Sequence, residues 1–369
     1  MSDTCKTFFV TGGGTGGHIY PAIAVADELL KEGKVYYIGN PYNMEYVLTV
    51  EKNYKFLPVF VKGMPRKFTP KLFSWGFSLL FSIIKCLTYI HRYKPSVVFA
   101  TGGYVSAPMI IASKLLKVPY VMHDCDAVPG LVSKKLSPSA KAVTLAFKDA
   151  ASHIHNENTT VCGNPIRKEF KTLSKEAAKS FLGLKNSLTV CITGGSQGAR
   201  SINNAVVDIL RELSQVHNIQ VVFQTGKKNY DDVIKHLELV YPKYRKDLNL
   251  IIKPYFADMI SVMKAADIII SRAGSLSLSE IAASSAAPIL VPYPYAAQDH
   301  QRYNAKSFAN HDACIYIEDN DMDSNSLLNA ILDLVKNKTK LDEIKTNCSK
   351  FAHYDAVDDI KKIILESAK

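Results

Sequence analysis

The chain contains two glycine-rich segments, one in each half, and each directly follows a short apolar run. The first segment is residues 12–18 (GGGTGGH) after the run at 7–10, and the second is 194–200 (GGSQGAR) after the run at 188–192. A strand that ends in glycines and leads into a helix leaves free backbone N–H groups at the positive end of the helix dipole. Such a turn binds anions, usually phosphate. Two of them predict two similar domains that face each other and bind phosphorylated groups between them.

The first segment fits the dinucleotide pattern GxGxxG, but its surroundings do not support a NAD site. That pattern needs an acidic residue at the end of the second strand, and here the run at 35–38 ends in Gly39 and Asn40. Neither glycine segment continues as GKS or GKT, which excludes a P-loop. His18 closes the first segment, where a neutral imidazole could act as a general base. The alternative is that His18 only caps or hydrogen-bonds the loop.

Two further polar segments in the first half follow predicted strands. Residues 101–108 (TGGYVSAP) come after the run at 97–100, and residues 123–126 (HDCD) come after the run at 120–122. The carboxyl ends of parallel strands meet at one edge of a sheet, where open α/β sheets bind their ligands. We therefore expect both segments to line that edge. Neighbouring residues of an extended chain point in opposite directions, so we expect no metal site at 123–126.

The second half repeats this arrangement with groups that suit a nucleotide sugar. Residues 271–280 (SRAGSLSLSE) follow the run at 267–270, and their small side chains let a ligand approach the backbone. The carboxylate of Glu280 can accept hydrogen bonds from ribose hydroxyls. Residues 291–301 (VPYPYAAQDHQ) add hydroxyl, amide and imidazole groups, which are the partners that a sugar needs.

Short apolar runs alternate with helical patterns along the chain, which predicts an α/β fold with parallel sheets covered on both faces. Helices are expected at 19–31, where Pro21 marks the start, at 72–89, and beyond about residue 325. Strands are expected at 7–10, 35–38, 97–100 and 120–122, and then at 188–193, 219–223, 249–252, 267–271, 289–291 and 314–317.

The predicted joint between the two domains lies near residues 162–165, where a loop leaves the first sheet. We therefore expect an N-terminal domain at 1–164, a C-terminal domain at 165–340 and C-terminal helices at 341–369. A chain of 369 residues with 47% apolar residues is long enough to give both domains a core of ordinary size.

The charge of the chain predicts an anionic partner. The formal net charge is +11, and residues 55–148 contain fourteen Lys or Arg residues against two acids. A basic face on one domain is typical of proteins that bind nucleic acid or an anionic membrane surface. The alternative is an ordinary solvated surface. We expect no nucleic acid, because the basic residues belong to no recognised RNA or DNA motif.

The cysteines and the hydropathy pattern suggest a reduced, cytosolic protein. The seven cysteines form no CxxC pair and no metal-like spacing, so we expect free and mostly buried thiols. The N-terminus does not resemble a signal peptide. No uncharged apolar stretch of about eighteen residues is expected, so no segment should span a membrane.

Residues 62–94 join a basic stretch to an apolar helix that contains Trp75, the only tryptophan of the chain. A basic stretch beside a Trp/Phe/Leu helix favours interfacial anchoring to anionic lipid. The alternative is a core helix with a solvated lead-in. The basic residues before the helix are Lys62, Arg66, Lys67 and Lys71.

Seven motifs occur in order: GGGTGGH, TGGYVSAP, AVPG (127–130), GNPIR (163–167), GGSQGAR, SRAGSLSLSE and PYPYAAQDHQxxNA (292–305). In type, order and spacing they resemble the MurG family, the peptidoglycan N-acetylglucosaminyltransferases that convert lipid I to lipid II. The resemblance covers about residues 8–305. It implies a GT-B fold, in which two Rossmann-like doubly wound parallel-sheet domains face a cleft and a C-terminal helix returns to the first domain.

The same resemblance implies roles for individual residues. The C-terminal domain would hold UDP-GlcNAc, and the first domain would receive the diphosphate of the acceptor. His18, or with less support Asp124, would take the proton from the C4 hydroxyl of MurNAc in an inverting transfer that uses no metal and no cofactor. The implied substrate contacts are Thr15, Gly16 and Gly17 for the donor, Arg167 and Ser196 for the nucleotide and phosphates, backbone near Phe256 for uracil, backbone at Ser275, Leu276, Ser277, Leu278 and Ser279, Glu280 for ribose, and Gln301 for GlcNAc. Asp126 lies at a position that resembles a further substrate contact.

One segment departs from the family pattern. The family usually has His-Glu-Gln-Asn before AVPG, and this chain has His-Asp-Cys-Asp at 123–126. Asp124 is a shorter acid, and Asp126 puts a charge where the family has an amide. A carboxylate near a diphosphate is unfavourable unless a cation or proton is nearby. This casts doubt on Asp126 as a substrate contact.

Two other functions fit the glycine loops. The first is a different GT-B enzyme, such as a glycolipid synthase or a UDP-GlcNAc epimerase, and an epimerase would need no lipid-facing helix. The second is a non-catalytic membrane subunit that binds a nucleotide sugar, which only the altered 123–126 segment favours. For the transferase we expect UDP-GlcNAc, lipid I and an anionic membrane surface as partners, with other cell-wall synthesis proteins as further candidates. We expect a peripheral location on the cytoplasmic face of the inner membrane.

Overall fold

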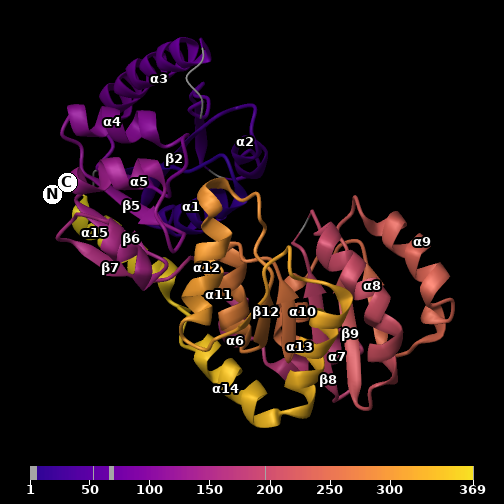
Figure 1. The fold of residues 1–369 in the computed structure, drawn as a ribbon. Helices are drawn as coiled ribbons and strands as arrows, with labels where there is room; N and C mark the ends of the chain where they lie inside the picture. The colour runs from indigo at the N-terminus through magenta and orange to yellow at the C-terminus, as the bar shows by residue number, and fades with distance from the viewer. Residues whose placement is uncertain (1–5, 53, 66–69, 196, 369) are drawn as a thin grey trace. The chain divides into compact units, whose positions relative to one another are not determined.

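The computed structural model describes residues 6–52, 54–65, 70–195 and 197–368 and divides into two compact units. The first unit comprises Met1–Ile166 together with Asp355–Lys369, and the second comprises Arg167–Tyr354. Each unit is an α/β domain built on one parallel sheet (Figure 1). The expected fold class of two doubly wound parallel-sheet domains is confirmed.

The strands of the first unit are short and apolar, and most of their residues are buried, as expected where helices cover both faces of a sheet. Val10 of the strand β1 pairs with Tyr37 on one side and with Phe99 on the other. Alternate residues of β1 enter opposite cores, Phe8 and Val10 one and Phe9 the other. The order across this sheet is β3 (Lys55–Pro58), β2 (Gly33–Gly39), β1 (Lys6–Thr11), β4 (Val97–Ala100), β5 (Tyr120–Asp124), β6 (Ala142–Leu145) and β7 (Thr159–Val161).

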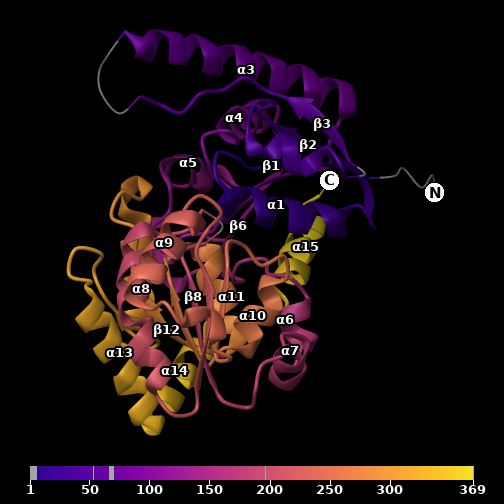
Figure 2. The ribbon, with the colours of Figure 1, turned by 90° about the vertical axis from the view of Figure 1, so that its right-hand side faces the viewer.

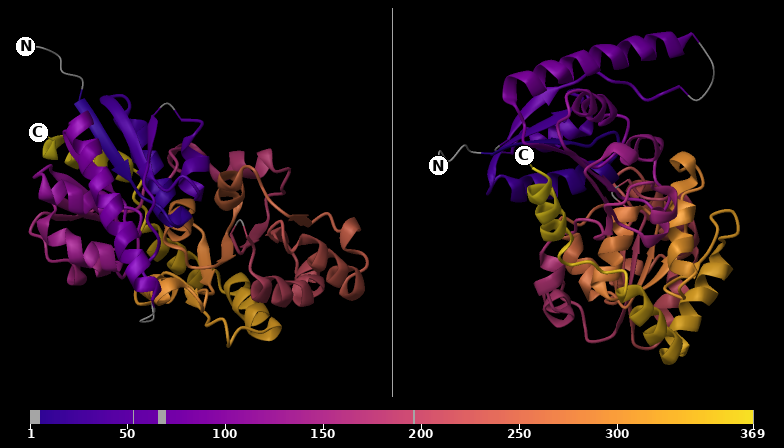
Figure 3. Two further views of the ribbon diagram at one scale, coloured as in Figure 1. Left: turned by 90° about the horizontal axis from the view of Figure 1, so that it is seen from above. Right: turned by 90° about the vertical axis from the view of Figure 1, so that its left-hand side faces the viewer.

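Helices cover both faces of this first sheet. On one face, Ile360 and Ile364 of the last helix share a core with Phe8, so the yellow C-terminal helix lies among the elements of the first unit (Figure 3). The opposite core contains Cys86 and Met109 from two other helices. The helices of this unit are α1 (Gly16–Leu29), α2 (Met44–Thr49), α3 (Lys71–Tyr93), α4 (Ala107–Leu115), α5 (Leu131–Leu136) and α15 (Ala356–Ser367).

α3 is a long helix at the margin of the first unit (Figure 2). Its mean hydropathy is 1.5 over Leu72–Tyr93, so by length and composition it is apolar enough to cross a membrane, and 17% of the apolar window is buried. The sequence-based expectation concerned an uncharged apolar stretch of about eighteen residues, and Lys85 divides this one. Isolated serines, a glycine and Lys85 interrupt the run without making it polar on average.

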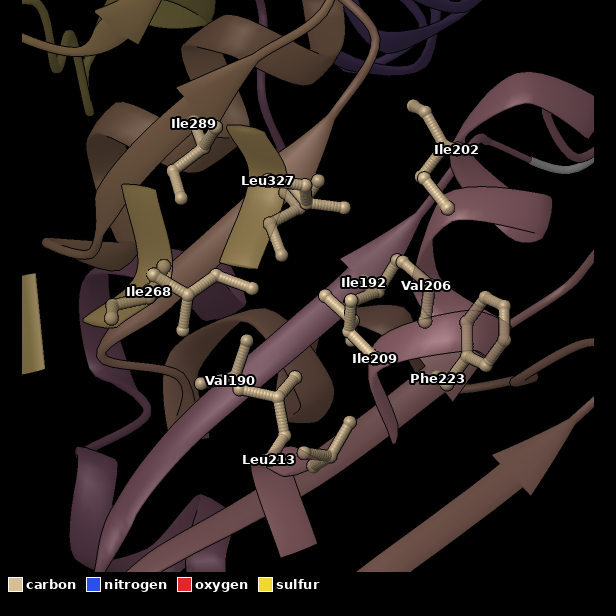
Figure 4. Close-up of a cluster of buried hydrophobic side chains, with 14 of the residues drawn as sticks. Val190, Ile192, Ile202, Val206, Ile209, Leu213, Phe223, Ile268, Ile289 and Leu327 are labelled. Atoms are coloured by element: carbon tan, nitrogen blue, oxygen red, sulfur yellow. The ribbon is translucent and has the colours of Figure 1, made fainter. Parts of the chain in front are cut away.

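The second unit repeats the layered arrangement. Ile202, Val206, Ile209 and Leu213 recur at helical spacing on one helix and pack in one core with Val190 and other strand residues (Figure 4). The strand order is β10 (Leu250–Lys253), β9 (Ile219–Gln224), β8 (Leu188–Thr193), β11 (Ile268–Ser271), β12 (Ala287–Leu290) and β13 (Ile315–Tyr316). The helices are α6 (Glu169–Thr172), α7 (Lys175–Phe181), α8 (Arg200–Gln215), α9 (Tyr230–Val240), α10 (Met259–Ala265), α11 (Ser275–Ser284), α12 (His300–Ala309), α13 (Ser324–Lys336) and α14 (Lys338–Ser349).

Some element boundaries differ from the sequence-based expectations. α1 begins at Gly16, directly at the glycine loop, and Pro21 lies inside the helix rather than at its start. β5 extends to Asp124, so His123 and Asp124 belong to the strand instead of following it. The short strands β3, β6 and β7 were not expected, because runs of three or four residues give little periodic signal.

Candidate active site

The first glycine loop connects β1 to α1 in the first unit and depends on close backbone contacts. Gly14 has a φ of +88°, which favours glycine. A Cβ at Gly12 would lie 2.0 Å from Oγ1 of Thr101, so a side chain cannot fit there. Thr15 caps α1 through its carbonyl, which accepts from the N–H of His18 at 3.1 Å. Gly16 and Gly17 form the first turn, where backbone N–H groups have no partner within the helix.

His18 lies against the second polar loop of the same unit. Its carbonyl accepts a hydrogen bond from Thr101 Oγ1 at 2.6 Å. Its ring faces Gly102 and Gly103, where Cβ atoms would come within 3.6 Å and 3.2 Å of the imidazole. Nδ1 is buried and has no hydrogen-bond partner among the described residues. The contact that holds the two loops together therefore uses the His18 backbone and leaves Nδ1 uncommitted.

Asp124 ends β5 as a buried carboxylate close to His18. It accepts hydrogen bonds from the backbone N–H of Asp126 at 3.2 Å and from the hydroxyl of Ser133. Burial and the charge of Asp126 raise the pKa of Asp124, while these hydrogen bonds and His18 lower it. Asp126 is only partly buried. The structure thus brings His18, Asp124 and Asp126 into one electrostatic neighbourhood.

The imidazole of His123 is not available for catalysis, because both of its ring nitrogens are hydrogen-bonded. Its ring nitrogens hydrogen-bond Thr144 Oγ1 at 3.0 Å and Asn164 Oδ1 at 3.2 Å. Burial lowers the pKa of His123 to about 4, so the ring is neutral near pH 7. Asn164 also donates to the carbonyl of Cys125 at 3.2 Å, which fixes the chain between the two acids. Sequence reasoning missed Thr144 and Ser133, because no motif marks them and only the fold brings them to this segment. Asn164 belongs to the GNPIR motif, but its bonds to His123 and Cys125 also depend on the fold.

In the second unit, the second glycine loop connects β8 to α8. Gly195 and Gly198 have φ angles of +79° and +76°. The N–H of Gly195 donates to Thr193 Oγ1 at 3.1 Å, and Gly198 packs so closely on the carbonyl of Thr225 that a Cβ would lie 2.1 Å from it. Ser196, an expected phosphate contact, lies outside the described residues.

The segment after β11 forms the start of α11. Gly274 caps the helix with its carbonyl, which accepts from the N–H of Leu278 at 2.9 Å. The N–H groups of Ser275, Leu276 and Ser277 therefore open the helix and are free of intrahelical partners. The side chain of Leu278 is wholly buried, and the hydroxyl of Ser279 donates to the carbonyl of Ser275. What this segment offers to a ligand is backbone.

Glu280 and Arg167 form an ion pair within the second unit. The distance from Arg167 Nη2 to Glu280 Oε1 is 3.3 Å, and the Arg167 guanidinium lies over the ring of Phe170 at 5.9 Å. Burial raises the pKa of Glu280, and Arg167 opposes that rise. About half of the Arg167 side chain stays exposed, so the guanidinium is open to a further anionic partner.

Gln301 has a fixed amide orientation. Its Oε1 accepts from the backbone N–H of Ala273 at 3.2 Å and of Tyr293 at 3.0 Å. The Nε2 group therefore points away from these donors and can donate to hydroxyl oxygens. Phe256 is buried, and its N–H donates to Gln224 Oε1 at 2.8 Å. That bond leaves the Phe256 carbonyl as the polar backbone group of this residue.

The thiols and acids of the described residues fit no metal centre. Among the described residues, no group of three or more His, Cys, Asp or Glu side chains is arranged to hold a metal ion. The described cysteines are free, and five of the six are buried: Cys86, Cys125, Cys162, Cys191 and Cys348, with Cys314 partly exposed.

Two family models match the chain. The glycosyltransferase family 28 N-terminal domain matches residues 8–145, and the C-terminal domain of the same family matches residues 189–360. A UDP-N-acetylglucosamine--N-acetylmuramyl-(pentapeptide) pyrophosphoryl-undecaprenol N-acetylglucosamine transferase of Desulforamulus reducens is 33% identical over 360 residues, which is 96% of this chain and 97% of the relative. The chain belongs to this transferase family. The expected glycosyltransferase class is thereby confirmed.

One solved structure gives the same assignment, and another shares only the fold. MurG of Acinetobacter baumannii matches with a TM-score of 0.79 and 26% identity over 98% of this chain and 99% of that one. UDP-GlcNAc 2-epimerase of Neisseria meningitidis, solved with UDP-GlcNAc, matches with a TM-score of 0.66 and 13% identity over 98% of this chain and 100% of that one. At that identity the likeness shows a shared fold alone. The epimerase alternative therefore has no support beyond the fold.

Proposed function

We propose that this chain transfers GlcNAc from UDP-GlcNAc to the C4 hydroxyl of MurNAc in lipid I, which yields lipid II and UDP in peptidoglycan synthesis. The observation that carries the proposal is the near full-length likeness to transferases whose name states this donor and acceptor. The polar groups of the second unit support it, because they match the parts of a nucleotide sugar one by one.

The donor is held by the second unit. The diphosphate meets the second glycine loop, where Ser196 is the expected side-chain contact, at the positive end of the α8 dipole. Glu280 accepts from the ribose hydroxyls, and Arg167, fixed beside it, adds a positive charge. The Phe256 carbonyl accepts from N3–H of uracil, because its own N–H is already bonded. Gln301 donates to hydroxyls of GlcNAc through Nε2.

The transfer is a single inverting displacement. The C4 oxygen of MurNAc forms a bond to C1 of GlcNAc while the bond from C1 to the diphosphate oxygen breaks, and the electron pair leaves with UDP. The imidazole of His18 accepts the hydroxyl proton. Asp124, buried nearby, stabilises the imidazolium that forms. The helix dipole and Arg167 take the role that a metal ion has in other glycosyl transfers.

The membrane partner is the exposed apolar face of α3. Phe73 and Phe77 are 74% and 73% exposed, and the same stripe continues at helical spacing. The remaining members of this α3 face are Leu80, Phe81 and Ile84. With the basic residues of the same unit, the α3 face suits an anionic lipid surface on the cytoplasmic side of the membrane.

The helix lies on the membrane and does not span it. Three side chains bind it to the end of β3 and the segment that follows, since Tyr89, Ser78 and Trp75 donate to the carbonyls of Pro58, Phe60 and Lys62. A helix that crossed the bilayer would lose these bonds. Trp75 thus serves the fold, because its indole N–H is used at 3.0 Å inside the unit. The lipid contact belongs to the α3 face instead.

The test of the proposed function is transfer of labelled GlcNAc from UDP-GlcNAc to a lipid I analogue, with and without EDTA. We expect transfer that EDTA does not reduce. Hydrolysis or epimerisation of UDP-GlcNAc without transfer would contradict the proposal, and so would tight UDP binding without any product.

A further inference from the structure

A pair of threonine and glutamine residues occurs twice on neighbouring strands of the second unit. β8 and β9 run parallel, with Thr189 opposite Gln220 near one end and Thr193 opposite Gln224 near the other. All four side chains are buried, with exposed fractions of at most 6%. A buried amide must satisfy its donors and its acceptor inside the protein. The hydrogen-bond partners of each glutamine therefore show which segments it connects at its end of the sheet.

Gln224, at the carboxyl end of β9, uses both ends of its amide. Nε2 donates to Thr193 Oγ1 at 3.2 Å and to the carbonyl of Gly195 at 3.3 Å. Oε1 accepts from the N–H of Phe256 at 2.8 Å. These three bonds fix the amide in one orientation, because exchanging its oxygen and nitrogen would set donor against donor and acceptor against acceptor.

Gly195 is held by hydrogen bonds rather than by packing. A Cβ at this residue would meet no atom within 4 Å, so no neighbouring side chain supports it from that direction. Its N–H donates to Thr193 Oγ1 at 3.1 Å, and its carbonyl accepts from Gln224 Nε2 at 3.3 Å and, within the loop, from the N–H of Gly198 at 3.1 Å. Thr193 and Gln224 are therefore the side chains that tie this part of the glycine loop to the two strands.

We infer that Gln224 is a positioning residue of the donor site. It fixes the glycine loop and the backbone at Phe256 relative to each other, so that the diphosphate and the uracil of one UDP molecule can bind to both at once. The inference rests on the proposed function, in which the loop meets the diphosphate and Phe256 meets the uracil. Gln224 itself is 4% exposed and acts through these two segments. Its loss removes the strand's hydrogen bond to the Gly195 carbonyl on one side and frees the Phe256 N–H on the other.

Gln220 provides a matched control on the same strand. It is 2% exposed, its Nε2 donates to Thr189 Oγ1 and to the carbonyl of Lys185, both at 2.9 Å, and its Oε1 accepts from the N–H of Lys185 at 3.0 Å. The chemistry and burial are thus the same as for Gln224. The groups that Gln220 joins lie at the amino end of the strands and include none of the proposed donor contacts.

The experiment compares Gln224→Met with Gln220→Met in the full-length protein. Thermal unfolding without ligand gives the stability cost of each change, and calorimetric titration with UDP and with CDP gives affinity and base preference. We expect both variants to lose stability to a similar extent, because each leaves buried polar groups unpaired. Only Gln224→Met should weaken UDP binding, by about tenfold or more, and lower the preference for UDP over CDP.

Equal UDP affinity in the two variants would overturn the inference while leaving the proposed donor site intact. A wild-type protein that binds no UDP would overturn both. If Gln224→Met does not fold, Thr193→Val decides the matter, with Thr189→Val as its control. The first should weaken UDP binding several-fold and the second should leave it unchanged, and the same affinity in both would count against the positioning role.

Discussion

At the scale of single residues, the side chains of His18, Asp124 and Asp126 in the first unit interact electrostatically. Asp124 is buried, Asp126 lies two residues further on, and the uncommitted Nδ1 of His18 faces the neighbouring loop. A second carboxylate at Asp126 makes the ionised form of Asp124 more costly, whereas His18 favours that form. These interactions lead to two predictions.

The first concerns His18 as the base of the proposed transfer. His18→Ala should lower kcat by about 100-fold or more, because the proton of the attacking hydroxyl then has no acceptor of suitable basicity. Thermal unfolding should change little, since the hydrogen bond to Thr101 uses the His18 backbone. His217→Ala, at an exposed histidine of the second unit, serves as the control. Near-normal turnover in His18→Ala would remove His18 from this role.

The second concerns Asp126, where this chain carries an acid in place of an amide. Asp126→Asn removes the charge that raises the pKa of Asp124, so the folded protein should gain stability where both acids are ionised. A raised carboxyl pKa costs stability above that pKa and costs nothing once the group is protonated. The gain should therefore be present at neutral pH, about 1 kcal/mol, and vanish as the pH falls through the carboxyl range.

Thermal unfolding of Asp126→Asn across pH measures this difference, and Glu212→Gln, which removes an exposed charge, is the control. A stability gain that persists at low pH would contradict the explanation by charge.

At the scale of elements, one carboxylate joins three parts of the second unit. Asp267, directly before β11, contacts Lys175 and Lys179 of α7 and Lys345 of α14 at 2.5, 3.7 and 2.8 Å. Burial by itself raises the pKa of Asp267, but the lysines outweigh it and lower the pKa to about 2. The pKa of Lys175 is also lowered, because burial and the neighbouring lysines outweigh the attraction of Asp267. The Asp267 carboxylate is thus the shared counter-charge of three lysines.

Asp267→Asn should destabilise the second unit by about 3 kcal/mol, since it leaves partly buried lysines without their counter-charge. A lowered carboxyl pKa stabilises above the ordinary value and loses that effect as the pH falls towards about 2. The gap between wild type and variant in urea unfolding should therefore narrow as the pH drops below about 4. A gap that is constant across pH would indicate lost packing or hydrogen bonds instead of lost charge.

The elements also show how far sequence reasoning reaches. The glycines that follow apolar runs predicted both loops, because a strand, a glycine turn and a helix start are consecutive in the chain and form a local sequence pattern. Gln224 could not be predicted, since a lone glutamine in an apolar strand gains its meaning only from the register of β9 with β8. The pairing of Arg167 with Glu280 joins residues 113 positions apart, which no local pattern contains. For Trp75, the helix was predictable, but its inward direction depends on where the segment after β3 lies.

At the scale of the whole molecule, the excess positive charge and the exposed apolar α3 face both belong to the first unit. The basic residues of 55–148 account for the excess charge of the chain, and the α3 face lies within the same window. The groups proposed to bind the donor lie in the second unit instead. Membrane association and UDP binding should therefore respond to different changes, and association itself should have an electrostatic and an apolar part.

Vesicle co-sedimentation separates these two parts. Binding of the wild type to vesicles that contain anionic lipid should weaken steeply as the salt concentration rises from about 0.05 M to about 0.5 M, because the Debye length shrinks several-fold. Phe77→Ser combined with Phe81→Ser should weaken binding about tenfold or more at every salt concentration, because two exposed aromatic side chains no longer enter the lipid. The control replaces Leu239 and Leu248, exposed leucines of the second unit, with Ser and should bind like the wild type. UDP affinity should be the same in all three proteins, and a loss of vesicle binding in the leucine control would mean that lipid contacts a surface other than the α3 face.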